Sequence, residues 1–253
     1  MSLNGDYIIS GIMGAGKGTQ SKKLADAIPG AVHFESSSVI REFIRTHTAA
    51  HDEIGVIIQG YIDKGELVPD EIIIDKIVEP AVSKILEQYP PSIIFDGFPR
   101  TVRQAEWLSQ KLARYQRKEH ARVIHLTLAE TPGEEEVEIV KRRAENRLVC
   151  TGPEPHTISL DQMSSSGVCP YCESSVEARR DDMDENSRNR RIKEYTENVL
   201  PALQCLEQTC NMRTQRVSGL PAREAVFNDI QKALQVMDQE VMREHAQEYR
   251  VRI

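Results

Sequence analysis

The sequence predicts an α/β protein in which a parallel sheet is flanked by helices. Short apolar runs rich in β-branched residues alternate with segments of helical periodicity, as in doubly wound folds. The run SIIF at residues 92–95 has three successive apolar residues, which is typical of a central parallel strand buried on both faces. A glycine-rich loop at residues 11–20 separates the first apolar run from the first helical segment. Because ligands of such folds bind at the carboxyl ends of the strands, the loop marks the expected site.

The first half of the chain contains three predicted strands. The run DYIIS leads directly into the glycine-rich loop, and the helical pattern that follows ends at Pro29-Gly30. A turn with the sequence GELVPDE separates two polar helical segments from a longer one. We expect strands at 6–10, 31–34 and 92–95, and helices at 19–28, 36–45, 52–63 and 70–88.

The second half continues this alternation, loses it, and regains it. Between residues 150 and 177 the periodicity vanishes and Gly, Pro, Ser and Cys dominate, which indicates an insertion with little core of its own. Residues 237–253 are highly charged and carry only a weak helical pattern. We expect strands at 122–128 and 216–218, and helices at 103–114, 184–208 and 221–236.

Composition restricts the class of protein. The 253 residues suffice for one sizeable domain with insertions, and 40% apolar and 28% charged residues are typical of a globular protein. A net charge of −7 argues against a surface that coats nucleic acid. The chain contains no apolar run of about 18 residues, and its first residues lack the layout of a signal peptide. We therefore expect a cytoplasmic protein.

The glycine-rich loop has the composition of a phosphate-binding loop. In GIMGAGKGTQ, Gly11 and Gly16 are five residues apart and Lys17 follows. Glycines let backbone N–H groups point at phosphate oxygens, the helix adds the positive end of its dipole, and the lysine ammonium reaches the terminal phosphates. A tight strand-to-helix turn with an incidental lysine is the alternative. Gly18 stands where general P-loops carry the Ser or Thr that binds Mg²⁺.

Several motifs, in order along the chain, resemble those of the adenylate kinase family in its long, LID-bearing form. The loop reads GxxGxGKGTQ, and DGFPRT at 96–101 is followed by Gln104-Ala105. Further matches are Ser36 and Arg41 in STGxxxR, Gly65 to Asp70 in GxLVxD, Arg143, Arg147 and Cys150 in RxxxRxxC, Arg179 to Asp182 in RxDD, and residues 217–219 at VDG. The resemblance extends to about residue 236. It implies a P-loop NTPase-type core (1–35, 68–147 and 192–253), a helical NMP-binding insertion (36–67) and a small cysteine-containing LID (148–191).

The resemblance also implies an activity and a site. Adenylate kinases transfer a phosphoryl group reversibly, ATP + AMP ⇌ 2 ADP, with Mg²⁺. The implied catalytic cations are Lys17, Arg100, Arg143, Arg147, Arg179 and one of Arg190 and Arg191, with Arg142 as an alternative to Arg143. The implied ATP-binding residues are Gly14, Ala15, Gly16, Lys17, Gly18, Thr19, Gln20, Arg143 and Gly219. The implied AMP-binding residues are Ser36, Arg41, Leu67, Val68, Gly97, Arg100 and Gln104.

Two residues of the DGFPRT…QA segment carry more specific expectations. Asp96 ends its predicted strand and is expected to hold Mg²⁺ through water; a helix-capping acid is the alternative. Gln104 is expected to read the acceptor base, since an amide both donates to and accepts from adenine, and with Thr101 it favours AMP. Ser37 and Ser38 replace the Gly-Asp of the family, which leaves the strictness of AMP binding open.

The LID of many bacterial family members binds structural zinc through CxxC…CxxC. Here Cys169 and Cys172 are present, but Pro153 replaces the partner of Cys150. We hypothesise a Cys₃His zinc site completed by His156; free thiols, or a zinc completed by water, are the alternatives. Cys205 and Cys210 lie in or beside a predicted helix and are interpreted as packing residues.

Three interpretations of the function remain. The first is an active adenylate kinase that serves adenine nucleotide homeostasis. The second is an enzyme of the same fold that uses another nucleoside monophosphate, and the third is a nucleotide-binding sensor without turnover. The presence of Lys17, Asp96 and Arg100 weighs against the sensor. We expect a monomer that binds ATP and AMP and has no nucleic-acid or membrane partner.

Overall fold

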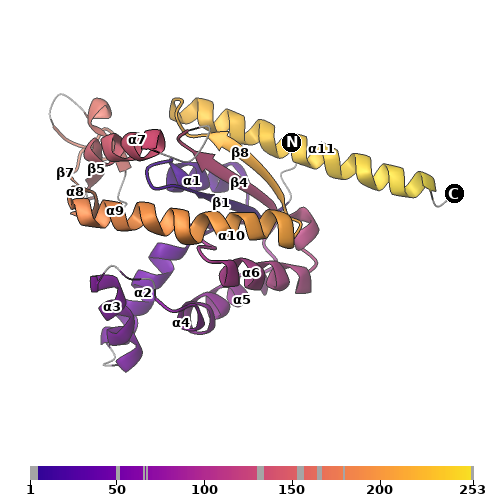
Figure 1. Ribbon diagram of the computed structural model, residues 1–253, viewed down its shortest axis with the longest axis horizontal. Helices are drawn as coiled ribbons and strands as arrows, with labels where there is room; N and C mark the ends of the chain where they lie inside the picture. The colour runs from indigo at the N-terminus through magenta and orange to yellow at the C-terminus, as the bar shows by residue number, and fades with distance from the viewer. Residues whose placement is uncertain are drawn as a thin grey trace.

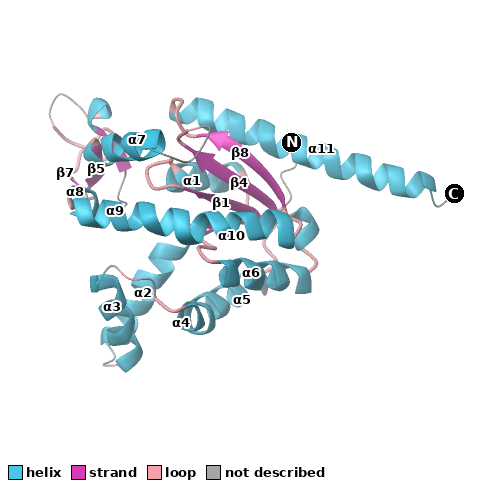
Figure 2. Cartoon of the chain, viewed as in Figure 1, coloured by secondary structure: helices cyan, strands magenta, loops and turns pink. Residues whose placement is uncertain are grey.

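The central element of the protein is a five-stranded sheet with the order β2-β3-β1-β4-β8. The computed structural model describes residues 5–49, 52–64, 66, 68–129, 134–152, 157–163, 167–178 and 180–251. All neighbouring strands of this sheet are parallel. The strands are β1 (Tyr7–Gly11), β2 (Val32–Glu35), β3 (Ile93–Asp96), β4 (Arg122–Thr127) and β8 (Arg213–Ser218). Of these, β1, β4 and β8 are labelled among the magenta arrows at the centre of Figure 2. The predicted α/β class is confirmed.

The core lies on both faces of the three middle strands. β1, β3 and β4 are buried along their whole length. Tyr7 pairs with Ile94 on one side and with Arg122 on the other, so the three strands begin in register. Continuous burial explains the three successive apolar residues at 93–95, because a central parallel strand has helices against both of its faces.

Helices cover the sheet in two layers (Figure 1). α1 (Lys17–Ala27) packs against α11 (Arg223–Val251), and both helices contact the sheet. The other layer contains α6 (Val102–Arg114) and one long helix, which crosses in front of the sheet in Figure 1. This long helix consists of α9 (Glu185–Glu194), π-helical turns at Tyr195–Val199 and Cys205–Thr209, and α10 (Leu200–Gln204). Cys205 and Cys210 are buried in this layer, in agreement with the predicted packing role.

A helical hairpin leaves the carboxyl end of β2. It consists of α2 (Ser36–Ala49) and α3 (Glu53–Lys64), which pack against each other below the sheet in Figure 1. The chain returns to the core through α4 (Asp70–Ile72), a π-helical segment (Ile73–Val78) and α5 (Glu79–Leu86). A single 3₁₀ turn (Lys118–His120) precedes β4.

A second, small sheet forms in the segment where the sequence predicts no regular structure. After α7 (Glu134–Glu145), the strands β5 (Arg147–Cys150), β6 (Thr157–Ser159) and β7 (Val176–Ala178) pair antiparallel in the order β6-β5-β7. A 3₁₀ turn (Leu160–Gln162) follows β6, and α8 (Arg180–Met183) follows β7. These strands were not predicted from the sequence. Strands of three or four residues are too short to show a period of two in the sequence.

The C-terminal helix is longer than the sequence predicts. The expected end lies near residue 236, whereas α11 continues to Val251. Met237 is 1% exposed, and Arg122 Nε donates to Asp238 Oδ1 at 3.1 Å. These contacts with the sheet stabilise a segment whose own periodicity is weak, because tertiary packing supplies most helical stability.

The other predicted strands and helices are confirmed, with ends that differ by a few residues. Within the part of the chain that the structure describes, no helix combines the length and apolar character needed to cross a membrane.

Candidate functional site

The glycine-rich loop connects the carboxyl end of β1 to the start of α1. Gly11, Gly14 and Gly16 have φ values of 144°, 79° and 93°, a region that glycine enters without strain. At Gly11 a Cβ would lie 2.1 Å from the Leu126 carbonyl oxygen of the neighbouring strand, so the close approach of β1 and β4 requires a glycine. Gly16 is the residue before the first turn of α1, whose unpaired N–H groups face the loop. The loop therefore has the geometry of an anion-binding turn.

Lys17 lies at the centre of a cluster of charges. Its Nζ donates to the Ile12 carbonyl at 2.9 Å. Burial lowers the pKa of the Lys17 ammonium from 10.5 to about 7; the carboxylate of Asp96 opposes this shift, and Arg100, Arg191 and Arg147 add to it. The cluster thus concentrates positive charge that an anionic ligand would neutralise.

Asp96 ends β3 and faces the glycine-rich loop. Its side chain is 8% exposed, and His33 Nε2 lies 3.4 Å from Oδ2. A Cβ on Gly18 would lie 3.4 Å from the same oxygen, so the glycine keeps open the space beside the carboxylate. A nearly buried carboxylate next to open space and the phosphate loop fits a hydrated Mg²⁺ ion, which takes oxygen ligands and retains several waters.

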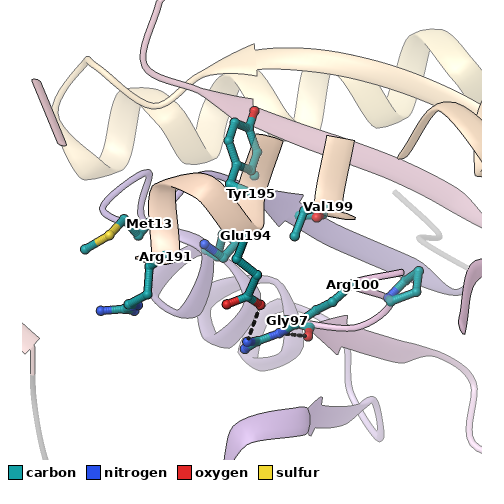
Figure 3. A pocket seen from close by; sticks show the side chains of 11 residues that line it. Met13, Gly97, Arg100, Arg191, Glu194, Tyr195 and Val199 are labelled. Atoms are coloured by element: carbon teal, nitrogen blue, oxygen red, sulfur yellow. Dashed lines mark hydrogen bonds and ion pairs between the residues drawn. The ribbon is translucent and has the colours of Figure 1, made fainter. Parts of the chain in front are cut away.

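Arg100 follows Asp96 through a tight connection. Gly97 has a φ of 71°, and the Phe98–Pro99 peptide bond is cis. Arg100 Nε donates to the Gly97 carbonyl at 2.9 Å, and its Nη1 donates to Glu194 Oε1 at 3.2 Å (Figure 3). The guanidinium is therefore fixed at both ends.

Asp182 joins the small sheet to the long helix. Its side chain is 1% exposed and accepts two hydrogen bonds from Arg147 of β5, at 2.6 and 2.5 Å, and one from Arg191 of α9, at 3.1 Å. This fork geometry places both guanidinium groups at the cleft. Arg190, one residue earlier, donates instead to Ser187 Oγ at 3.0 Å on the exposed face of the helix.

Arg143 connects α7 to two loops of the core. Its Nη1 donates to the Gly14 carbonyl at 3.0 Å, and its Nη2 donates to the Gly219 carbonyl at 2.8 Å. A Cβ on Gly219 would lie 2.6 Å from the Ala15 carbonyl oxygen, so the loop after β8 packs directly on the phosphate loop. Arg142 lines the cleft as well.

These groups surround one cleft of about 1210 Å³. The predicted site residues that line it are Gly14, Ala15, Gly16, Lys17, Gly18, Thr19, Gln20, Ser36, Asp96, Gly97, Arg100, Arg142, Arg143, Arg147, Arg191 and Gly219. A smaller cavity of about 70 Å³ shares Lys17, Arg100 and Arg191 with the cleft and is also lined by Glu194. Arg191 and Glu194 project into this space from one side of the long helix (Figure 3).

Other predicted residues do not line the cleft. Arg41 is 63% exposed and donates to Ser38 Oγ at 2.8 Å. Val68 is buried.

Gln104 is also buried, at 5% exposed. Its Nε2 donates to Asp70 Oδ1 at 2.6 Å, and its Oε1 accepts from the Arg100 N–H at 2.8 Å. Leu67 and Arg179 lie outside the described residues.

The three cysteines at and after the end of β5 come together in space. The Sγ atoms of Cys150, Cys169 and Cys172 all lie within 4.8 Å of one another, and those of Cys150 and Cys172 are 3.7 Å apart. Thiolates at about 2.3 Å from a tetrahedral zinc ion are about 3.8 Å apart, so the arrangement fits three zinc ligands. His156, the predicted fourth ligand, lies outside the described residues.

Several charged residues in and around the cleft were not among the predicted site residues, and Asp182, Glu194 and Arg223 are three examples. Asp182 belongs to a predicted motif without a role of its own, whereas Glu194 and Arg223 are charges on predicted helices. Arg223 lines the cleft and its Nη2 donates to the Thr157 carbonyl of β6 at 3.0 Å. Because most charged residues on a helix face solvent, the sequence carries no signal that separates these three from the rest.

Comparison with known proteins identifies the family. The family model described as adenylate kinase matches residues 9–210. An adenylate kinase of Geobacillus sp. (strain WCH70) is 32% identical over 231 residues, which are 90% of this chain and 98% of the relative. Adenylate kinases of Clostridium acetobutylicum and Carboxydothermus hydrogenoformans are each 34% identical, covering 90% of this chain and 97% and 98% of the relatives.

The matched region contains the phosphate loop, Asp96, Arg100, Arg143, Arg147 and Arg191, which are the groups that the fold brings to one cleft. The matches also extend over nearly the full length of the relatives. This chain therefore belongs to the adenylate kinase family.

Proposed function

We propose that this protein is an ATP:AMP phosphotransferase that catalyses ATP + AMP ⇌ 2 ADP with Mg²⁺. The observation that carries the proposal is the convergence of the phosphate loop, Asp96 and six arginines on one cleft. Phosphoryl transfer asks a protein to hold two polyanions in line and to neutralise the charge that develops on the transferred group. A cleft lined by Lys17 and several guanidinium groups meets that demand.

The donor nucleotide is assigned to the loop side of the cleft. Backbone N–H groups from Gly14 to Gln20 would receive the phosphates, and Lys17 would bind their terminal oxygens. Arg143 already bonds the two loops that face this position, so its guanidinium would lie beside the donor nucleotide. Asp96 would hold Mg²⁺ through water, and the ion would neutralise charge on the phosphates.

The acceptor is assigned to the side of the cleft that Ser36, Gly97 and Arg100 line. Arg100 is the cation that would bind the acceptor phosphate, with Arg41 at the edge of the hairpin as its second partner. Gln104 retains one amide proton and one lone pair beyond its bonds to Asp70 and Arg100, which would serve the acceptor base together with backbone near Val68. These assignments separate donor and acceptor phosphates by the cluster of Lys17, Arg147 and Arg191.

We further propose that residues 36–67 act as the acceptor-binding insertion and residues 148–191 as a LID over the core formed by 1–35, 68–147 and 192–253. The bonds from Arg147 and Arg191 to Asp182 tie the small sheet to the long helix. Movement of the LID would therefore carry both arginines relative to the phosphate loop. Such closure excludes water, which would otherwise accept the phosphoryl group.

The first experiment is an acceptor assay. ADP formation from MgATP is measured with AMP, CMP, UMP and GMP in turn, for the wild type and for Lys17→Ala. We expect turnover with AMP in preference to the other acceptors, and a loss of about 10²-fold or more in Lys17→Ala because donor-phosphate stabilisation is removed. Turnover that favours another monophosphate would contradict the AMP assignment. No turnover with any acceptor would contradict the enzyme.

The LID cysteines are proposed to bind one structural zinc ion, with His156 as the fourth ligand. The sulfur spacing supports three of the four ligands. The zinc content of protein purified without a metal-affinity tag is expected to approach one ion per chain, and Cys169→Ser is expected to lower both the content and the melting temperature. Less than about 0.2 zinc per chain, with an unchanged melting temperature in Cys169→Ser, would contradict the proposal.

We also propose that the enzyme acts in the cytoplasm as a monomer, with nucleotides as its partners and no role for nucleic acid or a membrane. The net charge of −7 supports the absence of a nucleic-acid surface. Sedimentation equilibrium is expected to give a mass near 28.6 kDa; a mass near twice that value would contradict the monomer.

A further inference from the structure

Four acidic residues line the two cavities of the nucleotide site: Glu35, Asp96, Glu194 and Glu224. Asp96 is assigned to Mg²⁺, and Glu224 forms an ion pair with Lys23 while remaining 76% exposed. Glu35 and Glu194 have no role in the proposed reaction. A carboxylate next to an acceptor phosphate repels it, so two such groups in this position require an explanation.

Glu194 binds the arginine proposed to hold the acceptor phosphate. Its side chain is 22% exposed, and its Oε1 accepts from Arg100 Nη1 at 3.2 Å. Figure 3 shows the carboxylate pointing from the long helix to the guanidinium, which the Gly97 carbonyl holds on its other side. An incoming phosphate therefore meets an Nη1 that already has an anionic partner.

Glu35 makes the corresponding contact at Arg41. Its two oxygens accept from Ser37 Oγ at 2.8 Å and from Ser38 Oγ at 2.6 Å, and Arg41 Nη2 lies 3.7 Å from Oε1. Burial alone would raise the pKa of Glu35, but the hydroxyls of Ser38 and Ser37 and the charge of Arg41 outweigh burial, so the pKa lies below its ordinary value. The two serines that depart from the family motif thus hold an ionised carboxylate beside Arg41.

We propose that Glu35 and Glu194 are positioning residues that occupy the two acceptor-phosphate arginines in the nucleotide-free protein and thereby weaken its affinity for AMP. The inference rests on the proposed function, because it needs Arg41 and Arg100 to bind the acceptor phosphate. Each arginine keeps a second hydrogen bond, Arg100 to the Gly97 carbonyl and Arg41 to Ser38 Oγ. A neutral side chain at either glutamate therefore removes the competing charge while the arginine stays in place.

The test compares Glu194→Gln, Glu35→Gln and the double variant with the wild type. We expect the KM for AMP to fall about threefold or more in each single variant, and further in the double variant. A threefold change corresponds to roughly 0.6 kcal/mol, which is the size of one partly exposed charge interaction. The KM for MgATP and kcat are expected to change by less than about twofold, since the charge removed faces the acceptor arginines. Calorimetric titration with AMP alone is expected to show the same fall in Kd.

Glu42→Gln is the matched control. Glu42 forms an ion pair with Arg45 on the same helix as Arg41 but does not line either cavity, and the substitution changes the net charge by the same amount. It is expected to leave the KM and Kd for AMP unchanged. Glu194→Asp, which restores the charge, is expected to return the AMP affinity toward that of the wild type.

An AMP affinity that is unchanged or weaker in both single variants would overturn the proposal, and so would an equal gain in Glu42→Gln. If Glu194→Gln does not fold, Glu35→Gln tests the same proposal, because the Glu35 side chain is more exposed than that of Glu194. The titration with AMP needs no turnover. A wild type that binds AMP but forms no ADP would therefore contradict the proposed function and still decide this inference.

Discussion

At the scale of single residues, the buried ammonium of Lys17 lowers the stability of the nucleotide-free protein. Its ammonium pKa is about 7 in the nucleotide-free protein, against 10.5 in the unfolded chain. Between these values the unfolded chain binds more protons than the folded protein, so this group makes stability rise with pH across the window. Below pH 7 the folded protein carries the buried charge, and the desolvation of this charge then lowers the free energy of unfolding by its full amount. A phosphate ligand that neutralises the charge would remove the cost.

We predict that Lys17→Met melts at a higher temperature than the wild type at pH 6, and that the difference shrinks at pH 9. The gain at pH 6 is expected to be a few degrees, since a change of about 1 kcal/mol shifts the melting temperature by about 2–4 °C in a chain of this size. Thermal unfolding followed by circular dichroism at both pH values measures the difference. An equal shift at pH 6 and pH 9 would show that the charge of Lys17 is not the cause.

His125 is a second buried titratable group with a measurable effect. It lies on β4, and its Nε2 is 2.8 Å from the Tyr195 hydroxyl. Burial, together with the positive charges of Arg216 and Lys17, lowers the pKa of His125 from 6.5 to about 4. Between these values the unfolded chain binds the extra proton, so stability falls as the pH drops from about 6.5 to 4.

We predict that His125→Gln loses less stability than the wild type over this pH range. A glutamine amide can keep a hydrogen bond with Tyr195 and does not titrate. Urea unfolding at pH 4.5 and pH 7 gives the two free energies for each protein. A pH dependence identical to that of the wild type would contradict the assignment.

At the scale of secondary-structure elements, Asp6 anchors the start of the central sheet. Its side chain is 0% exposed and accepts two hydrogen bonds from Arg117, at 2.7 and 2.6 Å, and one from the Ile93 N–H at 2.8 Å. These bonds hold the beginning of β1 to β3 and to the segment after α6. The register of β1 against β3 and β4 therefore starts from a buried ion pair.

We predict that Asp6→Asn lowers the free energy of unfolding by about 3 kcal/mol, because it leaves a largely buried guanidinium without its anionic partner. Asp26→Asn is the control: Asp26 pairs with Lys22 on the surface of α1, where both side chains are more than 60% exposed. That change is expected to cost less than about 1 kcal/mol. Equal effects in the two variants would show that burial of the Asp6–Arg117 pair does not add to the free energy of unfolding.

At the scale of the whole molecule, α11 links the end of the chain to the sheet. In Figure 1 the last turns of this helix extend beyond the sheet, whereas its first part packs on α1 and β8. Met242 is 72% exposed, in contrast to Met237 at 1%. Arg122, itself 3% exposed, has Asp238 as its acidic partner. The last buried contacts of α11 therefore lie near residues 237 and 238, whereas the later ion pairs of Arg213 with Glu240 and Glu244 join partly exposed side chains.

We predict that a chain ending at Val241 retains the kcat of the full chain and melts within a few degrees of it. A chain ending at Val236 is expected to lose about 3 kcal/mol or more of stability, because it lacks Met237 and leaves Arg122 without Asp238. Thermal unfolding and the ADP assay on both truncations measure these effects. Similar melting temperatures for the two truncations would contradict the boundary.

The sequence by itself determined the α/β class, the phosphate loop and the order of the core elements. These features depend on local patterns: apolar runs of four to six residues, glycines where the backbone requires positive φ, and motifs that are contiguous along the chain. The central strands were predictable because burial on both faces leaves short, mainly apolar runs in the sequence. The candidate site was predictable where its residues belong to such motifs, as at 11–20 and 96–101.

The packing of distant segments determines which charged residues face the cleft, and the sequence does not show it. Glu194 meets Arg100 across 94 residues of sequence, and Asp182 meets Arg147 across 35. Arg190 and Arg191 are neighbours with the same charge, yet only Arg191 lines the cleft. A one-residue step on a helix turns the side chain by about 100°, so orientation depends on how the helix packs and not on composition. The small sheet and the last part of α11 required the structure for the same reason, since distant partners hold them.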